Sequence, residues 1–191
     1  YGEAFGILAG DGLLNYAYET AARAFLMEPD HPTLGKALGI LASKTGIYGM
    51  IGGQSVDVEM EGKPLSREQL DFIYRLKTSA LIEASMMIGA VLAGASEETV
   101  NEIEKIGGNI GLAFQIQDDI LDVTGTEQVL GKPINSDEKN HKTTYVTIKG
   151  LEQAREDVEK ISGQALAGLD ALPCRDAFLR QLVVWLINRK N

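Results

Sequence analysis

Apolar residues recur every three to four positions over most of the chain, and this spacing predicts amphipathic α-helices. The predicted helices cover residues 3–27, 33–59, 66–93, 96–125, 144–169 and 176–188. Ser66 with Gln69 three residues later has the capping-box pattern, and Ser96 with Glu97 has the composition of a helix start. No long stretch alternates with the period of two that strands show. We therefore predict an all-α fold, with residues 1–191 forming one domain around a continuous core.

Glycine and polar residues interrupt this pattern at defined places. Gly10-Asp11-Gly12 predicts a bend or a close helix contact within the first helix. Glycines are frequent over residues 33–59, where they permit close packing and leave room for a ligand. Residues 126–140 are polar and predict a loop, and Pro173 predicts the end of the fifth helix.

Composition excludes several classes of function. The net charge of −9 and the pI near 4.8 argue against a nucleic-acid partner and against docking on an anionic membrane. No apolar run reaches the roughly 18 residues of a spanning helix, so no membrane insertion is predicted. Cys174 is the only cysteine, which excludes an internal disulfide and indicates a reducing, cytoplasmic compartment. His31 and His141 alone do not support a zinc site or a catalytic triad.

The strongest chemical signal is an acidic group inside an apolar helix, between Phe114 and Asp122. Asp118 and Asp122 lie one turn apart on the same face as Gln115, and Asp119 lies beside them. Carboxylates placed so close repel one another and lose hydration on burial. A hard cation such as Mg²⁺ is the natural partner of such oxygens. The alternative is a solvated acidic face or a cap cluster.

Other candidate residues have equally ordinary alternatives. Gln54 and Asp57 are three residues apart and share a helix face, which also suits an exposed polar helix end. Lys77-Thr78 lies among apolar residues, where a lysine either extends to water or points at an anion in a pocket. Lys132 and Lys142 follow the acidic group closely, where they either pair with it in solvent or hold the phosphates of a metal-bound ligand.

Five blocks of the chain resemble, in order, motifs of the trans-polyprenyl diphosphate synthases. They are Gly53–Asp57, Lys77-Thr78, Phe114–Asp122, Leu130-Gly131-Lys132 and Lys142-Thr143-Thr144-Tyr145. The likeness spans nearly the whole chain. Through Leu8–Leu14 and Asp118–Gly125 it is most similar to the bacterial farnesyl diphosphate synthases, also called geranyltranstransferases.

This resemblance implies an isoprenoid-synthase-type helical bundle around a central cavity. It implies an Mg²⁺-dependent 1'-4 condensation of an allylic diphosphate, dimethylallyl or geranyl, with isopentenyl diphosphate to give farnesyl diphosphate. It also implies a homodimer. Departure of the diphosphate requires concentrated positive charge, and the allylic cation requires apolar walls that exclude water.

The resemblance also implies a role for each matching residue. The metal-binding residues would be Asp118, Asp119 and Asp122. The lysines that contact the diphosphate would be Lys77, Lys132 and Lys142. Thr78 and Gln115 would direct oxygens at the carbocation. Gln54 and Asp57 would line the allylic pocket.

The sequence departs from the family in one respect. The first aspartate-rich motif and the arginine pair of the family would precede Tyr1, so we expect the N-terminal helices to be missing and these residues to be the C-terminal two-thirds. We expect the 191 residues alone to be inactive in an assay with Mg²⁺, geranyl diphosphate and isopentenyl diphosphate. The alternatives are a geranylgeranyl or longer-chain synthase, a non-catalytic regulatory subunit, or a terpene cyclase. The three aspartates favour an enzyme over a regulatory subunit.

Overall fold

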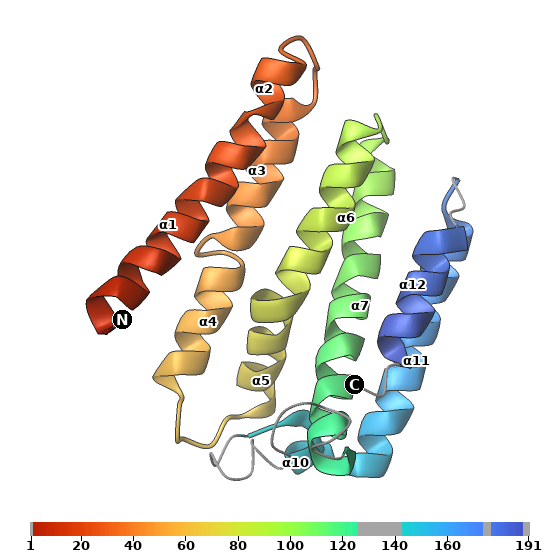
Figure 1. Cartoon of the computed structure of the whole chain (residues 1–191). Helices are drawn as coiled ribbons and strands as arrows, with labels where there is room; N and C mark the ends of the chain where they lie inside the picture. The colour runs from red at the N-terminus through yellow and green to blue at the C-terminus, as the bar shows by residue number, and fades with distance from the viewer. Residues whose placement is uncertain (1, 126–142, 174–176, 189–191) are drawn as a thin grey trace.

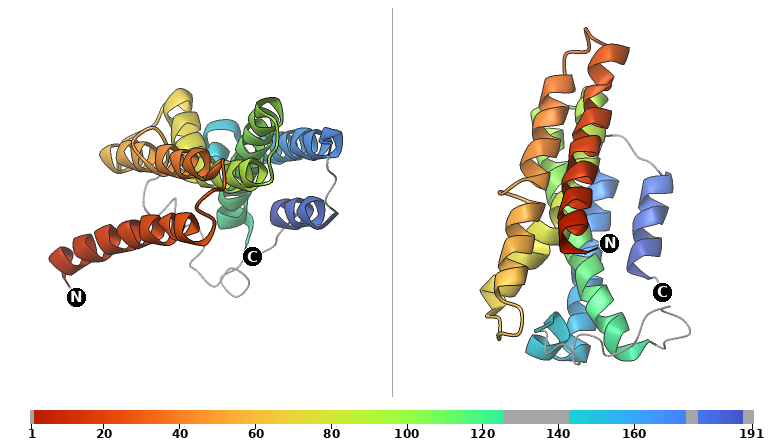
Figure 2. Two further views of the ribbon diagram at one scale, coloured as in Figure 1. Left: turned by 90° about the horizontal axis from the view of Figure 1, so that it is seen from above. Right: turned by 60° about the vertical axis from the view of Figure 1, so that its left-hand side comes forward.

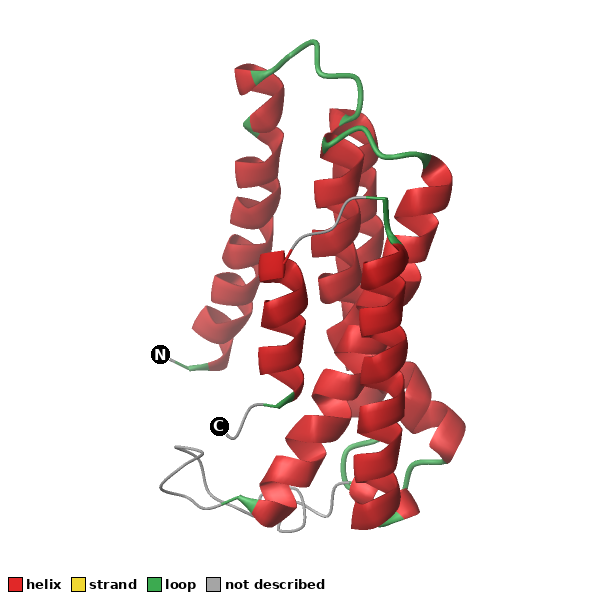
Figure 3. Ribbon diagram, turned by 90° about the vertical axis from the view of Figure 1, so that its right-hand side faces the viewer, coloured by secondary structure: helices red, strands yellow, loops and turns green. Residues whose placement is uncertain are grey.

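The computed structural model describes residues 2–125, 143–173 and 177–188, and all secondary structure within them is helical (Figures 1 and 3). The elements are α1 (Glu3–Ala22), α2 (Ala24–Met27), α3 (Leu34–Thr45), α4 (Met50–Glu59), α5 (Arg67–Ile73), the π-helix η1 (Tyr74–Ser79), α6 (Ala80–Leu92), α7 (Glu97–Thr124), α10 (Tyr145–Lys149), α11 (Leu151–Ala171) and α12 (Ala177–Ile187). The prediction of an all-α fold is confirmed. None of these helices is both long enough and apolar enough to cross a bilayer.

Side-chain caps fix three of the helix starts. The Ser66 hydroxyl accepts a hydrogen bond from the backbone N–H of Gln69, and the Gln69 side chain accepts one from the N–H of Ser66. Ser96 caps α7 through the N–H of Thr99. Thr144 caps α10 in a second capping box. These caps satisfy N–H groups that the first turn of a helix leaves without a partner.

The structure differs from the predicted helices at several places, including Arg23, which separates α1 from α2 within the first predicted helix. The expected bend at Gly10-Asp11-Gly12 is wrong, because α1 runs through it without interruption. The expected close contact is absent too, since no other described part of the chain lies within 4 Å of a Cβ built at either glycine. The second predicted helix is broken at residues 46–49 into α3 and α4. The fifth is broken at Gly150, whose φ of +82° is readily accessible only to glycine, into α10 and α11.

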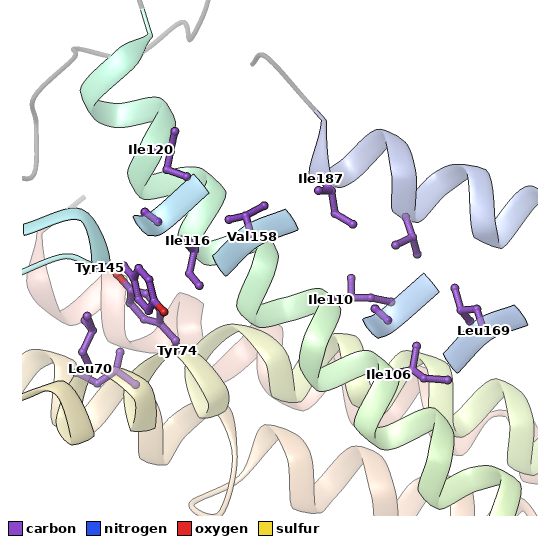
Figure 4. Close-up of a cluster of buried hydrophobic side chains, with 14 residues drawn as sticks. Leu70, Tyr74, Ile106, Ile110, Ile116, Ile120, Tyr145, Val158, Leu169 and Ile187 are labelled. Atoms are coloured by element: carbon purple, nitrogen blue, oxygen red, sulfur yellow. The ribbon is translucent and has the colours of Figure 1, made fainter. Parts of the chain in front are cut away.

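Helix α7 lies at the centre of the arrangement. It packs against α6 and α11, and α6 packs in turn against α3 (Figure 1). Among the described residues, the buried hydrophobic side chains form two clusters instead of the single core that we predicted. The larger cluster joins α5, η1, α7, α10, α11 and α12, and its labelled members include Tyr74, Ile116, Tyr145 and Val158 (Figure 4). The smaller one joins α3, α6 and the start of α7 through Ala37, Met87, Val91 and Val100.

Helix α1 lies apart from this packing and diverges from the rest of the chain when viewed from above (Figure 2). It contains no buried residue, although it carries large apolar side chains such as Phe5, Leu8 and Leu13. A hydrogen bond of 2.5 Å between Tyr18 Oη and Thr45 Oγ1 connects it to α3.

A charged triad connects α3, α6 and α7. The ammonium of Lys44 donates to the carboxylates of Glu83 and Glu104, the latter at 2.5 Å. The side chains of Lys44 and Glu83 are 18% and 14% exposed, so the ion pair between them replaces most of the water contacts that each loses on folding. Burial alone would lower the pKa of Lys44, but the hydrogen bonds to Glu104 and Glu83 outweigh it and raise the pKa above 10.5. The triad therefore stabilises the packing of these helices at neutral pH.

We expect Lys44→Met to lower the free energy of unfolding by about 1–3 kcal/mol, because it leaves two carboxylates facing each other without a cation. Because the folded pKa is raised, the contribution of Lys44 is complete below the usual lysine value and is lost only as the pH rises through the folded pKa. The difference between variant and wild type should therefore be constant from about pH 6 to about pH 9. Denaturant titration measures it.

Lys105→Met is the matched control, because Lys105 pairs with Glu102 along the same helix and both side chains are more than half exposed. We expect a change below about 0.5 kcal/mol for this variant. Equal losses in the two variants would show that the triad contributes no more than a surface pair.

Candidate active site

The π-helix η1 presents two of the predicted site residues, Lys77 and Thr78. Its wider turns are supported by Ser79, whose buried hydroxyl donates to the carbonyl oxygen of Tyr74 at 3.2 Å, five residues earlier. Short π-helical segments inside α-helices are frequent at functional sites. The π-helical geometry therefore supports a functional role for Lys77 and Thr78 that the flanking helices α5 and α6 do not share.

Two glycines bring neighbouring helices against η1. A Cβ at Gly53 of α4 would lie 2.5 Å from the backbone nitrogen of Lys77, and a Cβ at Gly111 of α7 would lie 2.5 Å from Cα of Ser79. Real side chains do not occupy such short distances, so only glycine allows these backbones to meet. The close packing that the glycines of residues 33–59 predicted is confirmed at Gly53.

The contact with α4 brings Lys77 to Asp57. The Lys77 ammonium donates to Asp57 Oδ2 at 2.6 Å, and the two side chains are 35% and 17% exposed. Lys77 and the exposed Gln54 also line an open cavity of about 640 Å³, together with Met50, Ile51, Ser55, Val58 and Glu59. The structure thus brings together three residues for which we predicted contacts with substrate.

The contact with α7 brings Thr78 to Gln115. Thr78 Oγ1 donates to Gln115 Oε1 at 2.9 Å, and Gln115 Nε2 lies 3.5 Å from Asp119 Oδ1. Three of the predicted site residues, from two elements, therefore form one polar chain. Because Thr78 uses its proton toward Gln115, the lone pairs of its oxygen remain suited to a positive charge.

The three predicted metal-binding aspartates lie in different surroundings. Asp119 and Asp122 are 3% and 2% exposed, whereas Asp118 is only partly buried. Asp119 Oδ2 accepts hydrogen bonds from the Tyr74 phenol and from the backbone N–H of Tyr145, the latter at 2.8 Å. Within the described residues, no three acidic, histidine or cysteine side chains are close enough to form a metal site by themselves.

The donor chemistry nevertheless fits magnesium bound together with a substrate. Mg²⁺ usually takes one or two carboxylates and completes its shell with waters and substrate phosphates, so it does not require an all-protein cage. Asp118, the most accessible of the three aspartates, is the oxygen donor that suits this mode. The assignment of Mg²⁺ to the aspartates stays a prediction, and Lys132 and Lys142 lie outside the described residues.

Two tyrosines next to the predicted residues were not predicted to have a role. Tyr74 lies at the start of η1, and Tyr145 begins α10. The phenol of Tyr145 donates to Asp157 Oδ2 at 2.6 Å, and the Lys149 ammonium donates to the same oxygen at 2.7 Å. Burial raises the pKa of Tyr145, and the hydrogen bond to Asp157 raises it further, so the phenol remains a donor at neutral pH. The sequence showed Tyr145 only as the last residue of a motif.

Comparison with known proteins decides the family. The profile of the polyprenyl synthetase family matches residues 1–171. The chain belongs to the polyprenyl synthetase family. The resemblance to trans-polyprenyl diphosphate synthases is thereby confirmed over most of the chain.

Relatives within this family differ in their products. The farnesyl diphosphate synthase of Geobacillus stearothermophilus is 40% identical over 161 residues, which are 82% of this chain and 52% of that protein. The geranylgeranyl diphosphate synthase of Cyanophora paradoxa is 38% identical over 192 residues, which are 100% of this chain and 64% of that protein. The chain therefore spans about half to two-thirds of the length of these relatives.

A solved structure at 35% identity confirms the fold. The geranyltransferase of Helicobacter pylori, in a complex with magnesium and isoprenyl diphosphate, superposes with a TM-score of 0.81 at 35% identity. The match covers 98% of this chain and 61% of that protein. The predicted class of isoprenoid-synthase helical fold is therefore confirmed.

We expect Gly111→Ala to lower the free energy of unfolding by about 1–3 kcal/mol, because the added methyl group collides with the backbone of Ser79. Displacement of α7 would also separate Thr78 from Gln115. Denaturant titration measures the first effect, and a crystal structure of the variant measures the second.

Gly163→Ala is the control, because Gly163 lies within α11 and no other described part of the chain comes within 4 Å of a Cβ built there. We expect this variant to gain up to about 1 kcal/mol from helix propensity. A gain of the same size for Gly111→Ala would contradict the tight crossing of η1 and α7.

Proposed function

We propose that the whole protein to which this chain belongs elongates isoprenoids by an Mg²⁺-dependent 1'-4 condensation. Its substrates would be an allylic diphosphate, dimethylallyl or geranyl, and isopentenyl diphosphate. The observation that carries the proposal is the pairing of Lys77 and Thr78 on one π-helix with Asp57 and Gln115 on the two helices that cross it. This arrangement occurs in a chain of the polyprenyl synthetase family.

The first role of the site is to bind the diphosphate leaving group. Lys77 provides a positive charge at the open cavity, and Asp57 fixes the direction of its side chain. Mg²⁺, when bound with the substrate through Asp118, would supply further positive charge to the departing diphosphate. Preorganised charge of this kind stabilises the developing anion because it requires no rearrangement during the reaction.

The second role is to protect the allylic cation. The oxygens of Thr78 and Gln115 place partial negative charge beside the reacting carbon, and their hydrogen bond holds them in position. An apolar cavity of about 1140 Å³ between α6, α7 and α12 begins at Leu81 and Ile82, one turn beyond Thr78. Its walls would hold the hydrocarbon chain and exclude water, which would otherwise trap the cation.

We propose farnesyl diphosphate as the product, as the sequence blocks suggest. The relatives include both farnesyl and geranylgeranyl diphosphate synthases, so a longer product is the alternative. Chromatography of the products distinguishes the two.

The remaining predictions from the sequence are carried forward as proposals. We propose that residues 1–191 belong to one helical domain of the whole protein. We also propose that the whole protein is a cytoplasmic homodimer. The exposed apolar side chains of α1 support an interface on this helix. Light scattering of the whole protein would contradict the homodimer if it gave the mass of a monomer.

We expect Lys77→Met in the full-length product of the gene to lower kcat by about 10²–10³-fold with Mg²⁺, geranyl diphosphate and isopentenyl diphosphate, because the leaving group loses a fixed positive charge. The rate is measured by the incorporation of radiolabelled isopentenyl diphosphate into a product that can be extracted into organic solvent.

Lys160→Met is the matched control, since Lys160 is an exposed residue of α11, distant in sequence from the site. We expect its rate to be that of the wild type. The proposal fails if the wild type forms no condensation product, and the role of Lys77 fails if its variant is as active as the control.

A further inference from the structure

Asp119 is a carboxylate inside the apolar core. Only 3% of its surface is exposed, and two of its hydrogen-bond donors, Tyr74 and Tyr145, are members of the larger core cluster. Both tyrosines lie close together at one end of that cluster (Figure 4). A buried carboxylate is costly unless donors replace the water that it loses. The position of Asp119 therefore depends on the groups that donate to it.

The two tyrosines lie on two other elements, and a third donor, Gln115, lies on the same helix as Asp119. Oδ2 accepts from the Tyr74 phenol on η1 and from the backbone N–H of Tyr145 at the start of α10, while Oδ1 faces Gln115 on α7 itself. The N–H of Tyr145 is one of those that the first turn of a helix leaves without an intrahelical partner. Asp119 therefore joins η1 and the start of α10 to α7.

The same geometry is unfavourable for a metal ion at Oδ2. An O–H and an N–H both point at this oxygen, and a cation would have to displace them to reach its lone pairs. Asp118, one residue earlier, is only partly buried. The two neighbouring aspartates therefore differ in what their surroundings allow.

The arrangement extends beyond Asp119. Tyr145, whose N–H is held by Asp119, donates its phenol to Asp157 of α11, and the Lys149 ammonium lies 4.9 Å from the centre of the Tyr145 ring. The start of α10 is thus fixed from both sides, by α7 and by α11.

We propose that Asp119 is a positioning residue and not a metal ligand: it holds η1, which carries Lys77 and Thr78, and the start of α10 against α7. The effect of Asp119 on catalysis rests on the function proposed above. The attachment of η1 and α10 to α7 through Asp119 does not depend on that function. The structural part can be tested without metal or substrate, by amide hydrogen exchange.

Two substitutions of Asp119 in the full-length protein separate the two roles. Asp119→Ala removes the acceptor, so we expect exchange of the Tyr145 amide to rise roughly tenfold in the absence of metal. Asp119→Asn keeps one oxygen that can accept from both tyrosines, so we expect exchange near that of the wild type. Unchanged exchange in Asp119→Ala would overturn the proposal.

The metal dependence provides the second readout. We expect Asp118→Asn to raise the Mg²⁺ concentration needed for half-saturation with inorganic pyrophosphate by at least about tenfold, measured by calorimetry. Asp119→Asn should change it by less than about threefold, because the amide oxygen can still accept from the phenol of Tyr74 and the N–H of Tyr145. An equal increase in the two variants would show that Asp119 binds the metal and would overturn the proposal.

A third variant keeps the proposal testable if Asp119→Ala does not fold. Tyr74→Phe removes one donor and retains the ring in the core, so we expect faster amide exchange over residues 74–79 with no change in the Mg²⁺ requirement. Amide exchange over residues 74–79 at the wild-type rate would contradict the proposal that Asp119 attaches η1 to α7. A wild-type protein that binds no Mg²⁺ and pyrophosphate would refute the proposed function, and the exchange data alone would then decide on Asp119.

Discussion

The site depends on the contact of two helix backbones with a third at positions that carry no side chain. Gly53 of α4 lies against the backbone of Lys77, and Gly111 of α7 lies against Ser79. Backbones that approach so closely leave little freedom to the side chains that flank the contact. The pairs Lys77–Asp57 and Thr78–Gln115 follow directly from these two crossings. A bulkier residue at either crossing would move Lys77 away from Asp57 or Thr78 away from Gln115, although it changes none of these polar side chains.

The polar site and the apolar core share residues. Tyr145 packs in the core cluster, donates its N–H to Asp119 and donates its phenol to Asp157. The carboxylate of Asp157 also accepts from Lys149, and these two hydrogen bonds outweigh the effect of burial and lower the pKa of Asp157. The network therefore contributes to stability at pH values above the usual aspartate range, and that contribution is lost as the pH falls through the lowered pKa. A substitution of Tyr145 or Asp157 is therefore expected to change both the stability of the fold and the position of α10.

Periodicity and capping patterns predicted the helices well, because both are local properties of the sequence. The helix starts at Ser66 and Ser96 follow from spacing alone. The distinct surroundings of Asp118 and Asp119 could not be predicted in this way. They depend on Tyr74 and Tyr145, which are 45 and 26 residues away from Asp119, and on which face of α7 meets other helices. Lys132 and Lys142 lie outside the described residues, and their roles stay predictions.

The π-helix also affects how this chain can change in evolution. Each residue of an α-helix advances the side chains by about 100°, so the wider turns of η1 shift the angular phase of α6 relative to α5. Loss of a single residue from η1 could restore regular α-helical turns while rotating Lys77 and Thr78 away from α4 and α7. The segment is therefore more sensitive to a change in its length than to most changes of its side chains. Insertions and deletions should be rarer across residues 74–79 than their helical character alone would suggest.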